Sequence, residues 1–179
     1  QDNRLEAGSY LLSDDEIAML TVVREHFKKV VLLLNVGNII DMTDINRIAP
    51  DSVLYVWQGG MTGGKGTADV LIGKVSPSGK LPDTIAYKVS DYPSDANFGR
   101  EENRDIYAED IYVGYRYFET FAKEKVLYPF GFGLSYTAFE IKTEKAEITE
   151  GAVKLSVSVK NIGSYRGKEV IEVYCEAPQ

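Results

Sequence analysis

The first third of the chain combines a helical pattern with short apolar runs. Apolar residues recur every three or four positions over residues 14–28, which predicts an amphipathic helix. Ser13 and Glu16 have the spacing of a capping box at its start. A continuous apolar run follows at residues 30–34, and runs of this length are typical of strands buried on both faces.

The next segments repeat the same alternation. An apolar run at residues 53–57 predicts a second buried strand, followed by a glycine-rich loop over residues 59–66 and a short helix over residues 67–72. About 20 residues separate the two predicted strands, which is enough for a crossover between parallel neighbours. The pattern therefore predicts an α/β layer with mostly parallel strands over residues 1–90.

The middle of the chain is irregular. Residues 76–82 combine proline, glycine and serine and are interpreted as a turn-rich segment. Residues 89–110 are charged and poor in apolar side chains, which predicts a long excursion over the surface. Residues 111–119 are rich in aromatic side chains and are predicted to form a strand.

After Tyr136 the pattern changes to alternation with a period of two. Residues 139–141, 153–159 and 171–175 each alternate between apolar and polar side chains, which is typical of antiparallel strands with one polar face. Three strands do not close a β-sandwich, which takes about seven. The segment is therefore interpreted as an incomplete second domain, although the strands could instead extend the first sheet.

Composition and charge exclude several classes of protein. Of the 179 residues, 44% are hydrophobic and 26% are charged, which is ordinary for a globular chain. The net charge of −7 argues against binding to nucleic acid or to an anionic membrane. The sequence has neither a signal segment after Gln1 nor an apolar run of about 20 residues, so we expect a soluble protein without a membrane-spanning segment. The single cysteine, Cys175, excludes an intrachain disulfide, and the single histidine, His26, argues against a histidine-rich metal site. We expect neither a metal nor a cofactor.

Two segments suggest ligand binding. The sequence from Gly59 to Thr67 nearly matches a phosphate-binding loop, but Gly66 stands where a hydroxyl would hold Mg²⁺. The same glycines would also suit a turn that lets the backbone approach a neighbouring segment or a ligand. Trp57, at the end of a predicted strand, could stack on a sugar ring or could belong to the core.

Three motifs together resemble the glycoside hydrolase family 3 enzymes. Residues 68–82, which include the sequence ADVLIG and the sequence SPSGKLP, resemble one conserved segment of that family. The sequence IYVGYRYF at residues 111–118 and the sequence YPFGFGLSYT at residues 128–137 resemble two others, in the same order. Residues 157–173 resemble the opening strands of the fibronectin-III-like domain that follows in many members.

This resemblance implies part of a retaining β-glucosidase that acts on terminal β-D-glucosides or β-xylosides. Residues 1–135 would be its α/β sandwich domain, and residues 136–179 a partial fibronectin-III-like domain. In this family a separate barrel carries the nucleophilic aspartate, and the active site lies between the barrel and the α/β domain. The expected partners are therefore the barrel of the same protein and a β-glucoside or oligosaccharide substrate.

The resemblance places no catalytic carboxylate in the chain. Asp2 and Arg4 resemble the end of the segment that carries the acid/base glutamate, so that glutamate would lie just upstream of Gln1, and Glu6 is out of register. Asp2, Arg4, Trp57 and Gln58 are the expected substrate-binding residues, and the chain alone is expected to be inactive. A nucleotide-binding domain using residues 59–67 and a non-catalytic carbohydrate-binding module remain the alternatives.

Overall fold

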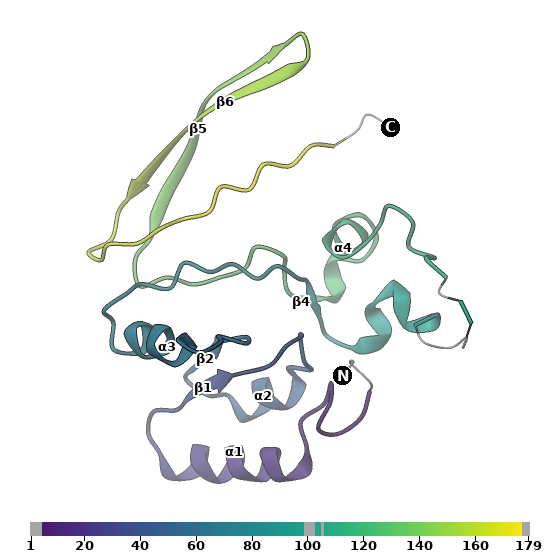
Figure 1. Ribbon diagram of the computed structural model, residues 1–179, viewed down its shortest axis with the longest axis vertical. Helices are drawn as coiled ribbons and strands as arrows, with labels where there is room; N and C mark the ends of the chain where they lie inside the picture. Colours follow the sequence, from purple (N-terminus) through teal and green to yellow (C-terminus); the bar gives the residue numbers. More distant parts are fainter. Residues whose placement is uncertain (1–4, 99–102, 105, 177–179) are drawn as a thin grey trace. The chain divides into compact units, whose positions relative to one another are not determined.

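The computed structural model describes residues 5–98, 103–104 and 106–176 as a mixed α/β protein with small sheets (Figure 1). The chain divides into two compact units. Unit 1 comprises Gln1–Gly63 and Leu81–Phe130, and unit 2 comprises Gly64–Lys80 and Gly131–Gln179. Within the described residues, no helix combines the length and the apolar character that crossing a bilayer requires.

Unit 1 begins with helix α1 (Asp14–His26), which confirms the prediction from helical spacing. The Ser13 backbone N–H donates to the Glu16 carboxylate at 2.8 Å, and the Glu16 N–H donates to Ser13 Oγ at 3.4 Å. The capping box predicted from the sequence is therefore present. It satisfies backbone groups that the first turn of a helix leaves without partners.

Strands β1 (Val31–Leu34) and β2 (Ser52–Tyr55) pair in parallel, as predicted. Helix α2 (Thr43–Ile48) lies in the connection between them. The main core of the unit surrounds this pair. Its buried members are Leu34, Ile40, Met42, Ile45 and Ile85.

Asp51 joins the starts of both strands. Its carboxylate accepts hydrogen bonds from the Val30 N–H at 2.9 Å, from Lys29 Nζ at 2.8 Å and from Arg24 at 3.1 Å. The Asp51 N–H donates in return to the Val30 carbonyl at 2.9 Å. The ammonium of Lys29 and the N–H of Val30 lower the pKa of Asp51 to about 2.

The strand predicted over residues 111–119 is wrong. Helix α4 (Tyr115–Phe121) occupies most of this segment in unit 1. Phe118 and Ala122, four residues apart, are buried together, and the Phe118 ring meets the Tyr92 ring edge-on at 5.5 Å. Because Phe118 and Ala122 are one helical turn apart, a helix buries both, and this burial outweighs the preference of the aromatic residues for a strand.

The rest of unit 1 contains short elements. Strands β3 (Ile85–Ala86) and β4 (Val126–Tyr128) pair antiparallel. The expected surface excursion contains the 3₁₀ helices η1 (Val89–Asp91) and η2 (Pro93–Ala96), and a third, η3 (Lys123–Lys125), follows α4.

Helix α3 (Gly63–Leu71), which lies in unit 2 apart from its first residue, starts earlier than predicted. The prediction placed a loop up to Gly66 and a helix only over residues 67–72. Each glycine disfavours a helix by about 1 kcal/mol relative to alanine, so the three glycines at the start of α3 cost about 3 kcal/mol together and weaken this helix without preventing it.

Unit 2 also contains the hairpin of β5 (Phe139–Thr149) and β6 (Ala152–Asn161). Their antiparallel pairing confirms the alternation predicted for the first two strands. The predicted third strand at residues 171–175 is wrong, because the structure assigns no strand pairing there. A period of two indicates an extended backbone, but a strand also needs a neighbour with which to form a ladder.

Two carboxylates at or just before this segment lie against the loops of unit 2. Glu169 forms an ion pair with Lys80 at 2.8 Å, and both side chains are largely buried. The hydrogen bond from Lys80 lowers the pKa of Glu169. Glu172 lies against Gly131, whose φ of +78° is one that residues with a side chain rarely adopt.

Two of the motifs that carry the family resemblance contact each other in unit 2. The hydroxyls of Ser76 and Ser135 lie 2.8 Å apart, and the Tyr136 N–H donates to Ser76 Oγ at 3.0 Å. Lys80 Nζ donates to the Gly133 carbonyl at 3.1 Å. Gly133 itself faces the carbonyl oxygen of Gly79, which leaves no room for a side chain.

We predict that Asp51→Asn lowers the free energy of unfolding at pH 7. The native pKa of Asp51 lies below its usual value of 3.8, so the carboxylate stabilises the fold above about pH 4 and loses this effect as the pH falls through 2. The difference between wild type and variant should therefore shrink from pH 4 to pH 2 in urea titrations. Glu25→Gln, at an exposed site of α1, is the matched control, and an equal pH response in both variants would contradict the prediction.

We predict opposite effects for two glycine-to-alanine substitutions. Gly133→Ala would force its Cβ against the Gly79 carbonyl and should destabilise the protein by about 1–3 kcal/mol. Gly66→Ala, in α3 with open space around the new Cβ, should stabilise it by about 0.5–1 kcal/mol. Thermal and urea unfolding measure the change in stability of both variants. A change of the same sign in both would refute the prediction.

Candidate functional site

The loops that follow β1 and β2 form the candidate site in unit 1. Leu34 pairs with Tyr55 at the carboxyl ends of the two parallel strands. The Val56 N–H donates to the Leu34 carbonyl at 2.9 Å, so the strands separate only after this bond. Ligands of α/β proteins bind outside the carboxyl ends of parallel strands, which is where residues 35–38 and 57–60 lie.

Trp57 directly follows this last bond and has an unusual backbone. Its φ is +56°, a left-handed conformation that costs a non-glycine residue roughly 1–3 kcal/mol. Its ring packs against Tyr55 with centroids 4.7 Å apart and a tilt of 41°, and the residue is half-buried. Strained residues of this kind cluster at ligand sites, so Trp57 is a candidate for contact with a ligand.

Tyr55 fixes the position of the Trp57 ring. The Tyr55 hydroxyl accepts a hydrogen bond from the Ile40 N–H at 2.9 Å. Burial raises the pKa of Tyr55 to about 12, so its hydroxyl stays neutral. A neutral, hydrogen-bonded tyrosine provides a fixed support beneath Trp57.

Gln58 connects the two loops. Its side chain is exposed and its amide lies against Gly37, where an added Cβ would come 3.0 Å from Gln58 Nε2. Glycine at position 37 therefore leaves room for this amide. The amide has both donor and acceptor atoms, so beside the aromatic ring it could bind a hydroxyl group.

The structure brings two of the four expected binding residues together. Trp57 and Gln58 lie at the end of β2, whereas Asp2 and Arg4 lie outside the described residues. The sequence reasoning missed the contributions of Tyr55 and Gly37. No local sequence signal indicates either contribution, because the contacts join segments about 15 to 21 residues apart.

The segment that resembles a phosphate-binding loop has helical structure from Gly63 onward. Lys65 and Gly66 lie in α3, and Lys65 is exposed. Among the residues that the structure describes, no three His, Cys, Asp or Glu side chains gather as metal ligands would. The geometry adds no feature that favours a nucleotide over other ligands.

Comparison with known proteins identifies the family. Residues 2–136 match the family described as "Glycosyl hydrolase family 3 C-terminal domain". The chain belongs to this family. This confirms the resemblance recognised in the three sequence motifs.

Relatives of the chain are much longer proteins. The chain is 64% identical over 178 residues to a protein named "Beta-glucosidase" from Ruminococcus albus, a match that covers 99% of the chain and 19% of the relative. It is 44% identical to "Beta-glucosidase A" from Butyrivibrio fibrisolvens, covering 100% of the chain and 24% of the relative. The chain thus spans about a fifth to a quarter of the length of these relatives.

Solved structures agree with this assignment. A β-glucosidase from Paenibacillus barengoltzii matches with a TM-score of 0.85 and 52% identity, over 92% of this chain and 18% of that one. β-Glucosidase 3B from Thermotoga neapolitana, solved in complex with α-D-glucose, matches with a TM-score of 0.83 and 37% identity, over 91% and 24%. The fold is therefore similar to the corresponding parts of family 3 β-glucosidases.

We predict that Tyr55→Phe destabilises unit 1. The substitution leaves the N–H of buried Ile40 without its acceptor, which should cost about 1–3 kcal/mol. Urea unfolding and hydrogen exchange at the Ile40 amide measure the effect. Tyr87→Phe, at a half-exposed tyrosine of the same unit, is the control and should change stability by less than about 0.5 kcal/mol. Unchanged exchange at Ile40 would contradict the prediction.

Proposed function

We propose that the chain is part of a retaining β-glucosidase that hydrolyses terminal β-D-glucosides or β-xylosides. The observation that carries the proposal is the family match over residues 2–136, together with relatives that are named β-glucosidases, one of them 64% identical. The relatives are about four to five times longer. The remaining domains, a barrel among them, are the proposed partners of this chain in the same protein.

The proposed reaction uses two carboxyl groups about 5–5.5 Å apart. One attacks the anomeric carbon, and the other protonates the oxygen of the leaving group. We place both carboxyl groups outside this chain. The chain contributes binding residues to the substrate site. Because it lacks both carboxyl groups, the 179 residues alone should not hydrolyse glycosides.

Trp57 and Gln58 are the proposed binding residues of unit 1. The Trp57 ring, held by Tyr55, offers a flat apolar face to the C–H face of a sugar. The Gln58 amide, adjacent in sequence, can donate to and accept from sugar hydroxyls. Asp2 and Arg4, which resemble the end of the acid/base segment, remain further proposed contacts.

The proposed domain organisation follows the sequence pattern. Residues 1–135 are proposed as an α/β sandwich domain and residues 136–179 as the beginning of a fibronectin-III-like domain. The family match ends at residue 136, which supports this boundary. The alternating strands β5 and β6 support an antiparallel domain after it.

The test is hydrolysis of 4-nitrophenyl β-D-glucopyranoside by the gene product that contains this chain. We expect hydrolysis by that protein and none by the 179 residues. Trp57→Ala should lower kcat/KM about tenfold or more, because an aromatic anchor at a binding site typically contributes that much. A gene product inert toward aryl β-glucosides would overturn the proposed function.

A matched variant isolates the role of Trp57. Tyr107→Ala removes an aromatic ring from an exposed position of unit 1 and should leave kcat/KM unchanged. Intact folding of both variants, measured by thermal unfolding, ensures that activity reports on binding. Equal losses in both variants would remove Trp57 from the site.

A further inference from the structure

Two exposed asparagines lie in the loop that follows β1, and the function proposed above gives them no role. Asn35 directly follows the last residue of β1, and Asn38 follows Gly37. Among the residues that the structure describes, neither side-chain amide has a hydrogen-bonding partner. Both amides can therefore bind a ligand without first breaking a contact within the protein.

The strand pairing brings Asn35 next to the loop that carries Trp57. The Val56 N–H donates to the Leu34 carbonyl at 2.9 Å, so the two segments still lie side by side at this point. Asn35 and Trp57 are the residues that directly follow Leu34 and Val56. Because neighbouring strands are about 4.8 Å apart, both loops begin within reach of one small ligand.

Gly37 brings Asn38 next to Gln58. A Cβ added at Gly37 would come 3.0 Å from Gln58 Nε2, so the two loops approach closely at this residue. Asn38 is the next residue of the chain and is exposed, as Gln58 is. Asn35, Asn38 and Gln58 therefore provide three amide groups around the loop that carries Trp57.

Hydrogen bonds at its far end hold the loop that carries the two asparagines. The Ile40 N–H donates to the Tyr55 hydroxyl at 2.9 Å, and the Asp41 N–H donates to the Tyr10 carbonyl at 2.8 Å. The Asp41 carboxylate accepts from the Thr43 N–H at 2.8 Å. Because β1 holds one end of the loop and these bonds hold the other, the loop loses less conformational entropy when it binds a ligand.

The charges around the two loops disfavour an anionic ligand. Residues 30–40 and 52–64, which include both strand ends and both loops, contain no charged side chain. Two acids lie close by. Asp41 follows the first segment directly, and the negative charge of Asp83 adds to burial in raising the pKa of Tyr55. An anion would lose its hydration here without gaining a cation as partner, so the loops favour a neutral ligand.

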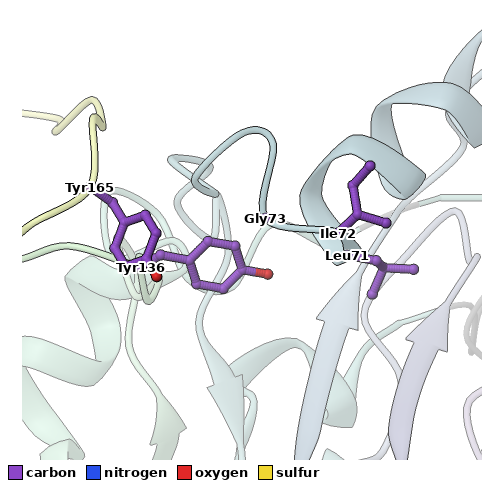
Figure 2. Close-up of a pocket in the computed structure, with 5 residues that line it drawn as sticks. All are labelled: Leu71, Ile72, Gly73, Tyr136 and Tyr165. Atoms are coloured by element: carbon purple, nitrogen blue, oxygen red, sulfur yellow. The ribbon is translucent and has the colours of Figure 1, made fainter.

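The hollow of unit 2 offers no comparable set of groups (Figure 2). It is lined by Leu71, Ile72, Gly73, Tyr136 and Tyr165, none of which has an amide or a charged side chain. The Tyr136 hydroxyl already donates to the Val70 carbonyl at 2.9 Å. The unpartnered amides that could bind a polyol therefore lie in unit 1.

Amide groups suit the hydroxyls of a sugar, because an amide and a hydroxyl each offer both a donor and an acceptor. The Trp57 ring adds the apolar surface that the C–H face of a sugar requires. We infer, on the basis of the proposed function, that Asn35 and Asn38 are further substrate-binding residues. Together with Gln58 they hydrogen-bond the hydroxyls of a neutral glycoside.

The test is binding of glucose to the gene product that contains this chain, measured by calorimetry in the absence of substrate. Asn35→Ala and Asn38→Ala should each raise the dissociation constant about three- to tenfold, which corresponds to the loss of one neutral hydrogen bond. Asn38→Asp keeps the size of the side chain but removes its N–H donors, so it should also weaken binding. An unchanged dissociation constant in any of these variants would overturn the inference.

A matched control separates binding from folding. Asn46→Ala, at an exposed asparagine of α2, should leave the dissociation constant unchanged, and an equal loss there would overturn the inference. All variants should retain the thermal unfolding midpoint of the wild type, and a drop in Asn35→Ala or Asn38→Ala that parallels the loss of binding would assign these residues a structural role instead. Because no hydrolysis is measured, a gene product that binds glucose through both asparagines but is inert toward aryl β-glucosides would refute the proposed hydrolysis and leave this inference standing.

Discussion

The parallel register of β1 and β2 is the constraint on which the rest of unit 1 depends. Pairing of Leu34 with Tyr55 decides where both strands end and therefore which loops meet. At one end Asp51 secures the pair through a carboxylate that contacts the backbone of one strand and two cations. At the other end the chain turns sharply at Trp57, whose conformation is tolerated because Tyr55 supports its ring. A slip of the register by one residue would reverse every side chain of a strand and dismantle both ends together.

Local patterns in the sequence were sufficient wherever neighbours along the chain decide the structure. The capping box at Ser13, the helix after it and the hairpin around residues 149–152 all depend on short-range contacts, and each was predicted correctly. Two errors fall where distant residues decide, whereas the early start of α3 at Gly63 is a local one. Residues 115–121 are helical because Phe118 packs against Tyr92, which lies 26 positions earlier in the chain. Residues 171–175 alternate between apolar and polar side chains but have no neighbouring strand with which to form a ladder.

The candidate site shows the same division. The apolar run before Trp57 predicted its place at the end of a strand, and the family resemblance added Gln58. The support from Tyr55 and the close approach of Gly37 to Gln58 could not be predicted, because each depends on the packing of segments about 15 to 21 residues apart. The hydrogen bonds of Tyr136 and Tyr165 also escaped prediction. The Tyr136 hydroxyl donates to the Val70 carbonyl of α3, the Asn161 amide donates to the Tyr165 carbonyl, and neither bond has a signature in the local sequence.

The close contacts at Gly37 and Gly133 differ in whether a second substitution could make room for a larger residue. At Gly37 the obstacle is the mobile end of the Gln58 side chain, so a larger residue at position 37 could be accommodated by a shorter one at position 58, and the two positions should covary among homologues. At Gly133 the obstacle is the backbone carbonyl of Gly79, which every amino acid possesses. No replacement at position 79 can remove it. Homologues should therefore keep glycine at position 133 independently of position 79, unless the loop itself changes length.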